Sequence, residues 1–257
     1  MNSPDTATEA LPFVAPSRPI AAKAPLRWLR LGWRDLAAAP LQSLSFGAGI
    51  AALSACVSAI ALRFGTGWLL LVLLSGFVFV APVLAIGLYA ISAALERGTR
   101  PSLSESIAAA RSSFGDALVY SLILMVICLV WVRAGSAVEI FFPEMAVPSS
   151  IELATFFAIG SAVGSVFALV AFAASAFSLP MLLDRRTDAV TAVVTSVNAV
   201  LRNKRAMLVW AVLIVLSVVI GFATALVGLA ITMPLIGHAT WHAYREAIDA
   251  SAWPPRA

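Results

Sequence analysis

The stretch Trp68–Ala94, WLLLVLLSGFVFVAPVLAIGLYAISAA, decides the fold, because it is apolar over the length that a bilayer-crossing helix needs. Such a helix takes about 20 mostly apolar residues to cross the hydrocarbon core. The rest of the 257-residue chain agrees with this interpretation, since 61% of its residues are hydrophobic and only 12% are charged. Soluble domains are about half apolar and about a quarter charged. We therefore expect membrane lipid to surround most of the chain.

Further apolar runs lie on both sides of this stretch, and together they predict an all-α, polytopic transmembrane helical bundle. The six expected spans cover about residues 42–62, 68–94, 117–137, 153–183, 207–225 and 228–245. The last two come from one apolar region, 207–237, which is also compatible with a single long helix. The expected membrane domain is 26–248. It is flanked by a disordered cytoplasmic tail, 1–25, and by a short C-terminal tail, 249–257.

The distribution of Lys and Arg predicts how the spans are oriented. With six spans and a cytoplasmic N-terminus, 15 Lys and Arg residues lie on the cytoplasmic side and 2 on the other side. Cytoplasmic loops of membrane proteins carry such an excess, so we expect both termini in the cytoplasm. The formal charge of +4 is spread between apolar runs and forms no compact basic domain, so we do not expect a nucleic-acid partner.

A threefold pattern underlies the six spans. Pro82, Pro180 and Pro234 each lie late in an even-numbered span, and an amphipathic stretch precedes each odd-numbered span, over 26–40, 101–117 and 187–206. These stretches are too polar to cross the membrane, and we expect them to lie in its cytoplasmic interface. The pattern favours three repeats of an amphipathic helix plus a helical hairpin. The alternative is that proline is simply common in membrane helices.

The sequence contains no recognisable catalytic motif. It lacks GxSxG, a Walker pattern, HExxH and CxxC, and Cys56 and Cys128 lie inside apolar runs. The central parts of the six spans contain no Asp, Glu, Lys or Arg, which argues against an ion-coupled transporter. We therefore expect that the protein is not an enzyme and that it binds no cofactor, apart from a possible divalent metal that is described in the next paragraph.

The stretch 233–248, MPLIGHATWHAYREAI, holds both histidines of the chain and supports three interpretations. His238 and His242 share one helix face and could bind a divalent metal, with Asp184 or Glu96 as a further ligand. The interpretation that we favour is an interfacial anchor formed by His238, Trp241, His242, Tyr244 and Arg245 at the headgroup level. The third is an internal cluster on the cytoplasmic face that contains Trp33, Arg34, Asp35, Asp184, Arg185, Trp241, Tyr244 and Arg245.

Four segments, GWRDLAAAP (32–40), GLYAISAALERG (87–98), LPMLLDRRTDAVTAVVTSV (179–197) and PLIGHATWHAYRE (234–246), carry a family resemblance. Through them the chain resembles a bacterial family of predicted integral membrane proteins that is known only as a domain of unknown function. The resemblance covers about residues 26–248. It implies a multi-span protein of the bacterial inner membrane, and it supplies no catalytic residues.

These observations predict an uncharacterised inner-membrane protein with a non-enzymatic role, as a scaffold or envelope-assembly factor. One alternative is a facilitator-type transporter or lipid-handling protein, and another is a metal-binding membrane protein that uses His238 and His242. The expected partners are membrane lipids, and the sequence does not identify protein partners.

Overall fold

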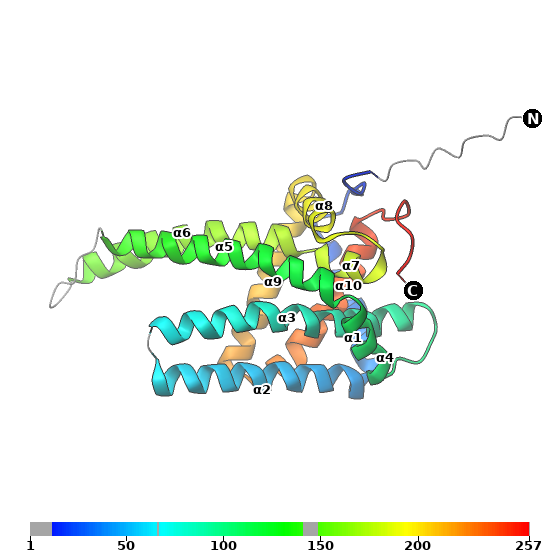
Figure 1. The fold of residues 1–257 in the computed structure, drawn as a ribbon, viewed down its shortest axis with the longest axis horizontal. Helices are drawn as coiled ribbons and strands as arrows, with labels where there is room; N and C mark the ends of the chain where they lie inside the picture. Colours follow the sequence, from blue (N-terminus) through cyan, green and yellow to red (C-terminus); the bar gives the residue numbers. More distant parts are fainter. Residues whose placement is uncertain (1–11, 66, 141–148, 257) are drawn as a thin grey trace, which may run out of the picture.

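The structure, a computed structural model, describes residues 12–65, 67–140 and 149–256. Within them the chain is helical, and its only β-structure consists of two isolated bridges (Figure 1). The helices are α1 (Ala24–Ala38), α2 (Pro40–Phe64), α3 (Gly67–Glu96), α4 (Leu103–Ser112), α5 (Phe114–Ile140), α6 (Ser150–Ser175), α7 (Ser178–Asp184), α8 (Ala189–Arg202), α9 (Lys204–Ala223) and α10 (Leu229–Ala247).

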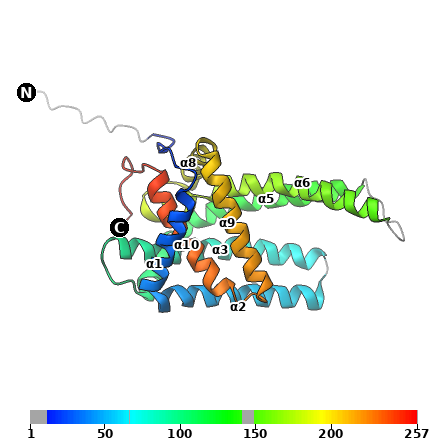
Figure 2. The same ribbon diagram turned by 180° about the vertical axis from the view of Figure 1, so that it is seen from behind.

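Two long helical hairpins, α2–α3 and α5–α6, extend in the same direction from a common end (Figures 1 and 2). The short helices α1, α4, α7 and α8 and the C-terminal segment 248–256 gather at that end, which we call the base. Among the described residues, five helical segments are long and apolar enough to cross a membrane: Pro40–Phe64, Val78–Glu96, Phe114–Ala137, Ser150–Asp184 and Lys204–Ala223. The structure thus agrees with an all-helical membrane protein.

The sixth expected span corresponds to α10, which is not one of these five segments. The second half of α10, TWHAYREA from Thr240 to Ala247, is polar, and this makes the helix as a whole less apolar than the five candidate spans. The apolar region 207–237 nevertheless forms two helices and not one long helix. The turn between α9 and α10 contains Ala225 and Leu226 with φ angles of 51° and 70°. The six-span count therefore remains a prediction.

The order of the elements matches the expected threefold pattern, because a short helix precedes each of the hairpins α2–α3, α5–α6 and α9–α10. The orientation of the third hairpin differs from that of the other two. In both views α9 runs across the two long hairpins and not alongside them (Figures 1 and 2). The order of elements thus repeats three times, but the third hairpin is oriented differently from the first two. The threefold structural repeat remains a prediction.

Helix α10 lies at the centre of the packing, in contact with α1, α2, α3, α7 and α9. Glycines allow three of these close approaches. A Cβ atom on Gly32 of α1 would lie 2.7 Å from the backbone nitrogen of Ala239, and one on Gly47 of α2 would overlap the carbonyl oxygen of Ala230. A Cβ atom on Gly237 of α10 would lie 2.8 Å from the side chain of Leu88 in α3. Small residues of this kind let the backbones of membrane helices approach closely.

The segment that precedes α1 differs from the expected disordered tail. Over residues 12–23 the chain packs against the base: Ser17 forms an antiparallel bridge with Ile248, and the backbone N–H of Arg18 donates to the carbonyl oxygen of Ala247 at 2.8 Å. The backbone N–H of Ala15, a fully buried residue, donates to Thr195 Oγ1. Backbone groups at the end of α10 therefore hold this segment in place. The prediction of a disordered tail is wrong for residues 12–23. The rest of the expected tail, residues 1–11, lies outside the described residues.

The C-terminal tail also pairs with the base. Arg185 forms an antiparallel bridge with Pro255, and the backbone N–H of Arg256 donates to the carbonyl oxygen of Asp184 at 2.9 Å. Residues 185–186 and 254–256 thus hold each other in place beside α7.

Helix α8 contacts the protein through its small and polar face. Thr195, Ser196 and Ala199 are buried, whereas Val190 is 48% exposed. The hydroxyl of Ser196 accepts from the backbone N–H of Phe177 and donates to the carbonyl oxygen of Ala173. These bonds satisfy backbone groups where the helix breaks between α6 and α7, so the polar residues of α8 stabilise that break.

We predict that Gly47→Ala lowers the free energy of unfolding by about 1–3 kcal/mol, because the added methyl group overpacks the contact between α2 and α10. The matched control is Gly49→Ala in the same helix, where a Cβ atom would meet nothing within 4 Å. That control gains helix propensity and should be neutral or slightly stabilising. Thermal unfolding of the purified variants in detergent measures the difference, and equal stability of both would contradict the close approach.

Candidate functional site

His238 of α10 is fully buried and connects three helices through its imidazole ring. Its Nε2 lies 2.8 Å from Ser43 Oγ of α2, and its Nδ1 lies 2.8 Å from Ser92 Oγ of α3. A neutral imidazole has one donor and one acceptor nitrogen, so one serine accepts from the ring and the other donates to it. Both nitrogens therefore have hydrogen-bonding partners on neighbouring helices.

His242, one turn further along α10, pairs with α1. Its Nε2 lies 2.8 Å from Asp35 Oδ2, and both side chains are mostly covered by protein. The next residue on the same face, Glu246, also binds α1: it accepts a hydrogen bond of 2.7 Å from Trp28 Nε1 and forms an ion pair with Arg27. These contacts fix α1 along the C-terminal half of α10.

Glu96, the last residue of α3, binds two side chains of α10. Its Oε2 accepts a hydrogen bond of 2.7 Å from Trp241 Nε1, and its Oε1 accepts one of 3.0 Å from Arg245 Nε. The guanidinium of Arg245 also lies over the Trp241 ring, 6.0 Å from the ring centroid. One carboxylate thus joins the ends of the first and third hairpins.

Asp184, at the end of α7, is the second acidic partner of α10. Its Oδ2 accepts hydrogen bonds from Tyr244 Oη at 2.8 Å and from Arg185 Nε at 2.9 Å, and it lies 3.6 Å from Arg245 Nη1. Arg185 in turn donates to the carbonyl oxygen of Trp253. This carboxylate links the second hairpin and the C-terminal segment to α10.

Six polar residues of α10 therefore each contact a side chain on another helix. We call these residues and their partners the α10 clamp; they are His238, Trp241, His242, Tyr244, Arg245 and Glu246, with Ser43, Ser92, Asp35, Glu96, Asp184, Trp28 and Arg27. Because the partners come from α1, α2, α3 and α7, the clamp fixes the base ends of all three hairpins relative to one another.

The structure brings together most, but not all, of the residues of the expected polar cluster. Asp184, Arg185, Tyr244 and Arg245 share one network, and Trp241 joins it through Glu96. Asp35 pairs with His242, not with Arg245.

Two residues of the expected cluster lie elsewhere. Trp33 and Arg34 are exposed on the outer face of α1, and the Trp33 side chain is 54% exposed. The interfacial anchor, which the sequence favours, does not fit the structure either. Trp241 and Tyr244 are 3% and 1% exposed, so protein and not lipid headgroups covers them.

Sequence reasoning missed the serine partners of His238 and the partners of Glu246. Ser43 and Ser92 look like ordinary small residues within apolar helices, and Trp28 has the features of an interfacial residue of an amphipathic stretch. The usable signal was a histidine in an apolar helix, which requires polar partners wherever it is buried.

The metal interpretation of the histidine pair stays a prediction. Among the described residues no three His, Cys, Asp or Glu side chains gather in a way that could hold a metal ion. In this structure His238 and His242 contact different helices, through Ser43 and Ser92 in one case and through Asp35 in the other.

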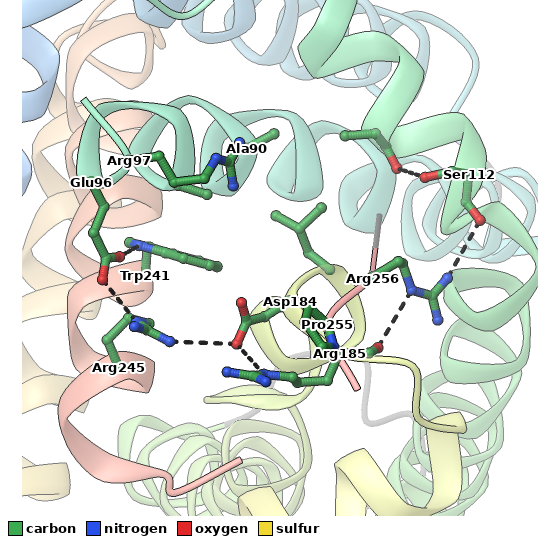
Figure 3. Close-up of a pocket in the computed structure, with 13 residues that line it drawn as sticks. Ala90, Glu96, Arg97, Ser112, Asp184, Arg185, Trp241, Arg245, Pro255 and Arg256 are labelled. Carbon is green, nitrogen blue, oxygen red and sulfur yellow. Dashed lines mark hydrogen bonds and ion pairs between the residues drawn. The ribbon is translucent and has the colours of Figure 1, made fainter. Parts of the chain in front are cut away.

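A cavity of about 580 Å³ borders the α10 clamp at the base (Figure 3). It lies between the ends of α3, α4, α7 and α10 and the C-terminal segment. Its charged lining residues are Glu96, Arg97, Asp184, Arg185, Arg245 and Arg256. Figure 3 shows Arg97 on the α3 side of the cavity, with Asp184 and Arg185 across from it. The cavity could hold a small charged group, and it contains no nucleophile paired with a base.

We predict that Ser43→Ala lowers the free energy of unfolding by about 1–3 kcal/mol, because it leaves a buried imidazole nitrogen without its partner. The control is Ser45→Ala in the same helix. The Ser45 hydroxyl is exposed and donates only to the carbonyl oxygen of Leu41 in its own helix. That variant should stay within about 0.5 kcal/mol of the parent. Equal effects of both substitutions on thermal unfolding would show that the contact with His238 does not stabilise the fold.

Comparison with known proteins gives one family match. Residues 69–184 match the family model described as Predicted integral membrane protein (DUF2189). No curated protein and no solved structure matches the chain. The matched range runs from α3 to α7 and includes Glu96 and Asp184, the two acidic partners of α10, but not α10 itself. The match thus supports the resemblance to a family of predicted integral membrane proteins.

Proposed function

We propose that the protein is a non-enzymatic scaffold of the bacterial inner membrane and that the whole chain belongs to the matched family. The α10 clamp carries this proposal. Its polar groups are the ones from which a catalytic or ion-binding site could be built, and they are engaged in contacts between helices. Such residues in a membrane protein ordinarily mark function. Here their contacts give them a structural role.

The proposed topology has six spans, with the base and both termini in the cytoplasm. Helix α9 begins at the base with Lys204, and α10 returns the chain to the base at Ala247. The chain therefore enters and leaves the third hairpin on the same side, which favours an even number of crossings although α9 is inclined to the two long hairpins. The base carries an excess of Arg and Lys, including Arg27, Arg97 and Arg185, as cytoplasmic faces do.

The second candidate function is a facilitator or lipid-handling protein, and the cavity at the base favours it. A transport route would need a polar path from one membrane face toward the midplane. The cavity lies instead among the ends of the helices, beside Glu96 and Asp184. The position of the cavity therefore supports binding of a ligand at the cytoplasmic face more than passage of a substrate across the bilayer.

A scaffold needs a surface that partner proteins can reach, and the base offers apolar side chains for this. Trp33 of α1, Ile107 of α4 and Val190 of α8 are 54%, 40% and 48% exposed. All three lie on short helices that are expected to follow the cytoplasmic interface, where both lipids and partner proteins have access.

In living cells, we predict that a benzophenone amino acid at Trp33, Ile107 or Val190 forms a photo-crosslink to a specific protein through that protein's cytoplasmic segment. The control position is Leu169 of α6, which is 58% exposed within a candidate span. It should react with lipid alone. Lipid adducts alone at all three base positions would argue against a scaffold, and an adduct with a periplasmic segment would overturn the orientation.

A further inference from the structure

The cavity at the base is bounded by both carboxylates that bind α10. Glu96 and Asp184 lie in its lining, and each is already committed: Glu96 to Trp241 and Arg245, and Asp184 to Tyr244, Arg185 and Arg245. These contacts leave the carboxylates poorly suited to bind an external cation. The cavity therefore favours an anion over a cation as its ligand.

The charge balance supports an anion. Four guanidinium groups line the cavity, those of Arg97, Arg185, Arg245 and Arg256, together with the two carboxylates. A third carboxylate, that of Asp116, pairs with Arg256 from outside the lining. Four positive charges against three negative charges leave one positive charge in excess.

Arg97 supplies this excess charge. Within the described part of the chain its guanidinium has no ion pair and no hydrogen bond, whereas the other three each bind an acidic side chain. Across the cavity, Arg245 uses Nε and Nη1 in its contacts, and its Nη2 group has no partner among the described residues. Free N–H donors thus line the cavity on more than one side.

We propose that this cavity binds an anionic phosphate group, with Arg97 as the ligand that carries the free charge. Guanidinium groups bind phosphate through paired, charge-assisted hydrogen bonds. A tetrahedral phosphate presents acceptor oxygens in several directions, which suits donors on opposite walls better than a planar carboxylate would. The volume of about 580 Å³ exceeds that of a phosphate alone and leaves room for a glycerol or similar group attached to it.

Two sources can supply such a group: an anionic phospholipid or free phosphate. The cavity opens where α3 and the segment Ser150–Asp184 end, and apolar residues such as Ala90, Ala93 and Leu183 share its lining. Lipid phosphates lie at this depth if the base faces the cytoplasmic leaflet. The assignment of the phosphate to a lipid depends on the proposed orientation of the base. The phosphate site itself does not depend on it, and it goes beyond the proposed scaffold function.

The test measures dissociation constants on the full chain in a neutral detergent by native mass spectrometry. The probes are short-chain phosphatidylglycerol, short-chain phosphatidylcholine and inorganic phosphate. The variants are Arg97→Gln and the control Arg100→Gln, which removes the same charge three residues later from an exposed side chain outside the cavity lining. We expect Arg97→Gln to weaken binding by on the order of tenfold and Arg100→Gln to leave it unchanged. Thermal unfolding of both variants checks that the fold is intact.

The probes separate the two sources. Arg97-dependent binding of phosphatidylglycerol, with weaker binding of phosphatidylcholine and inorganic phosphate, supports the lipid source. Binding of inorganic phosphate that depends on Arg97 and is as tight as that of phosphatidylglycerol supports the free anion. No binding of either anionic probe, or equal loss in the two variants, overturns the phosphate site. Because the measurement is made in detergent, its outcome is independent of membrane orientation and of partner proteins.

Discussion

A polar side chain in the interior of a membrane protein must find its partner within the protein, because lipid offers none. His238 shows this constraint most clearly: it is fully buried in α10, and both of its ring nitrogens contact serine hydroxyls from other helices. Leaving one such group unpaired costs about 1–3 kcal/mol. The requirement to pair the polar residues of α10 therefore determines where α1, α2, α3 and α7 lie at the base.

This constraint also explains why α10 differs from the other long helices. A helix that faced lipid along its length would be apolar throughout, as α9 nearly is. Helix α10 is surrounded by protein in its second half, where Trp241, Ala243 and Tyr244 are buried. Glycines at the contacts with α1 and α2 let those helices come close enough for the polar pairs to form.

The sequence predicts the apolar helices well, since hydropathy is a local property that each segment carries by itself. It predicts the polar contacts less well, because the partners are distant in the chain. Ser43 and Ser92 lie 195 and 146 residues from His238, and nothing in their local sequence links them to it.

The same limit applies to the direction of a helix face. The amphipathic pattern of α1 and α8 identifies two faces, but only the packing reveals that Trp28 of α1 and the Ser and Thr residues of α8 face inward. For the same reason Trp33 and Arg34, which belong to a strongly patterned stretch, lie outside the cluster that they were expected to join.

The α10 clamp and the neighbouring cavity divide the polar residues of the base into two groups. Glu96 and Asp184 are used in both, since they hold α10 and line the cavity, whereas Arg97 belongs to the cavity alone. A structural network that neutralises the carboxylates leaves the cavity positively charged. The arrangement that stabilises the base thus also creates the conditions for binding an anion there.

We infer that side-chain pairs between α10 and the other helices stabilise the bundle. A double-mutant cycle on Asp184 and Tyr244, built from Asp184→Ala, Tyr244→Phe and the double variant, tests it most directly. The hydroxyl of Tyr244 donates to Asp184 at 2.8 Å, so the free energies of unfolding should show a coupling of about 0.5–3 kcal/mol. Strictly additive effects of the two substitutions would contradict the claim.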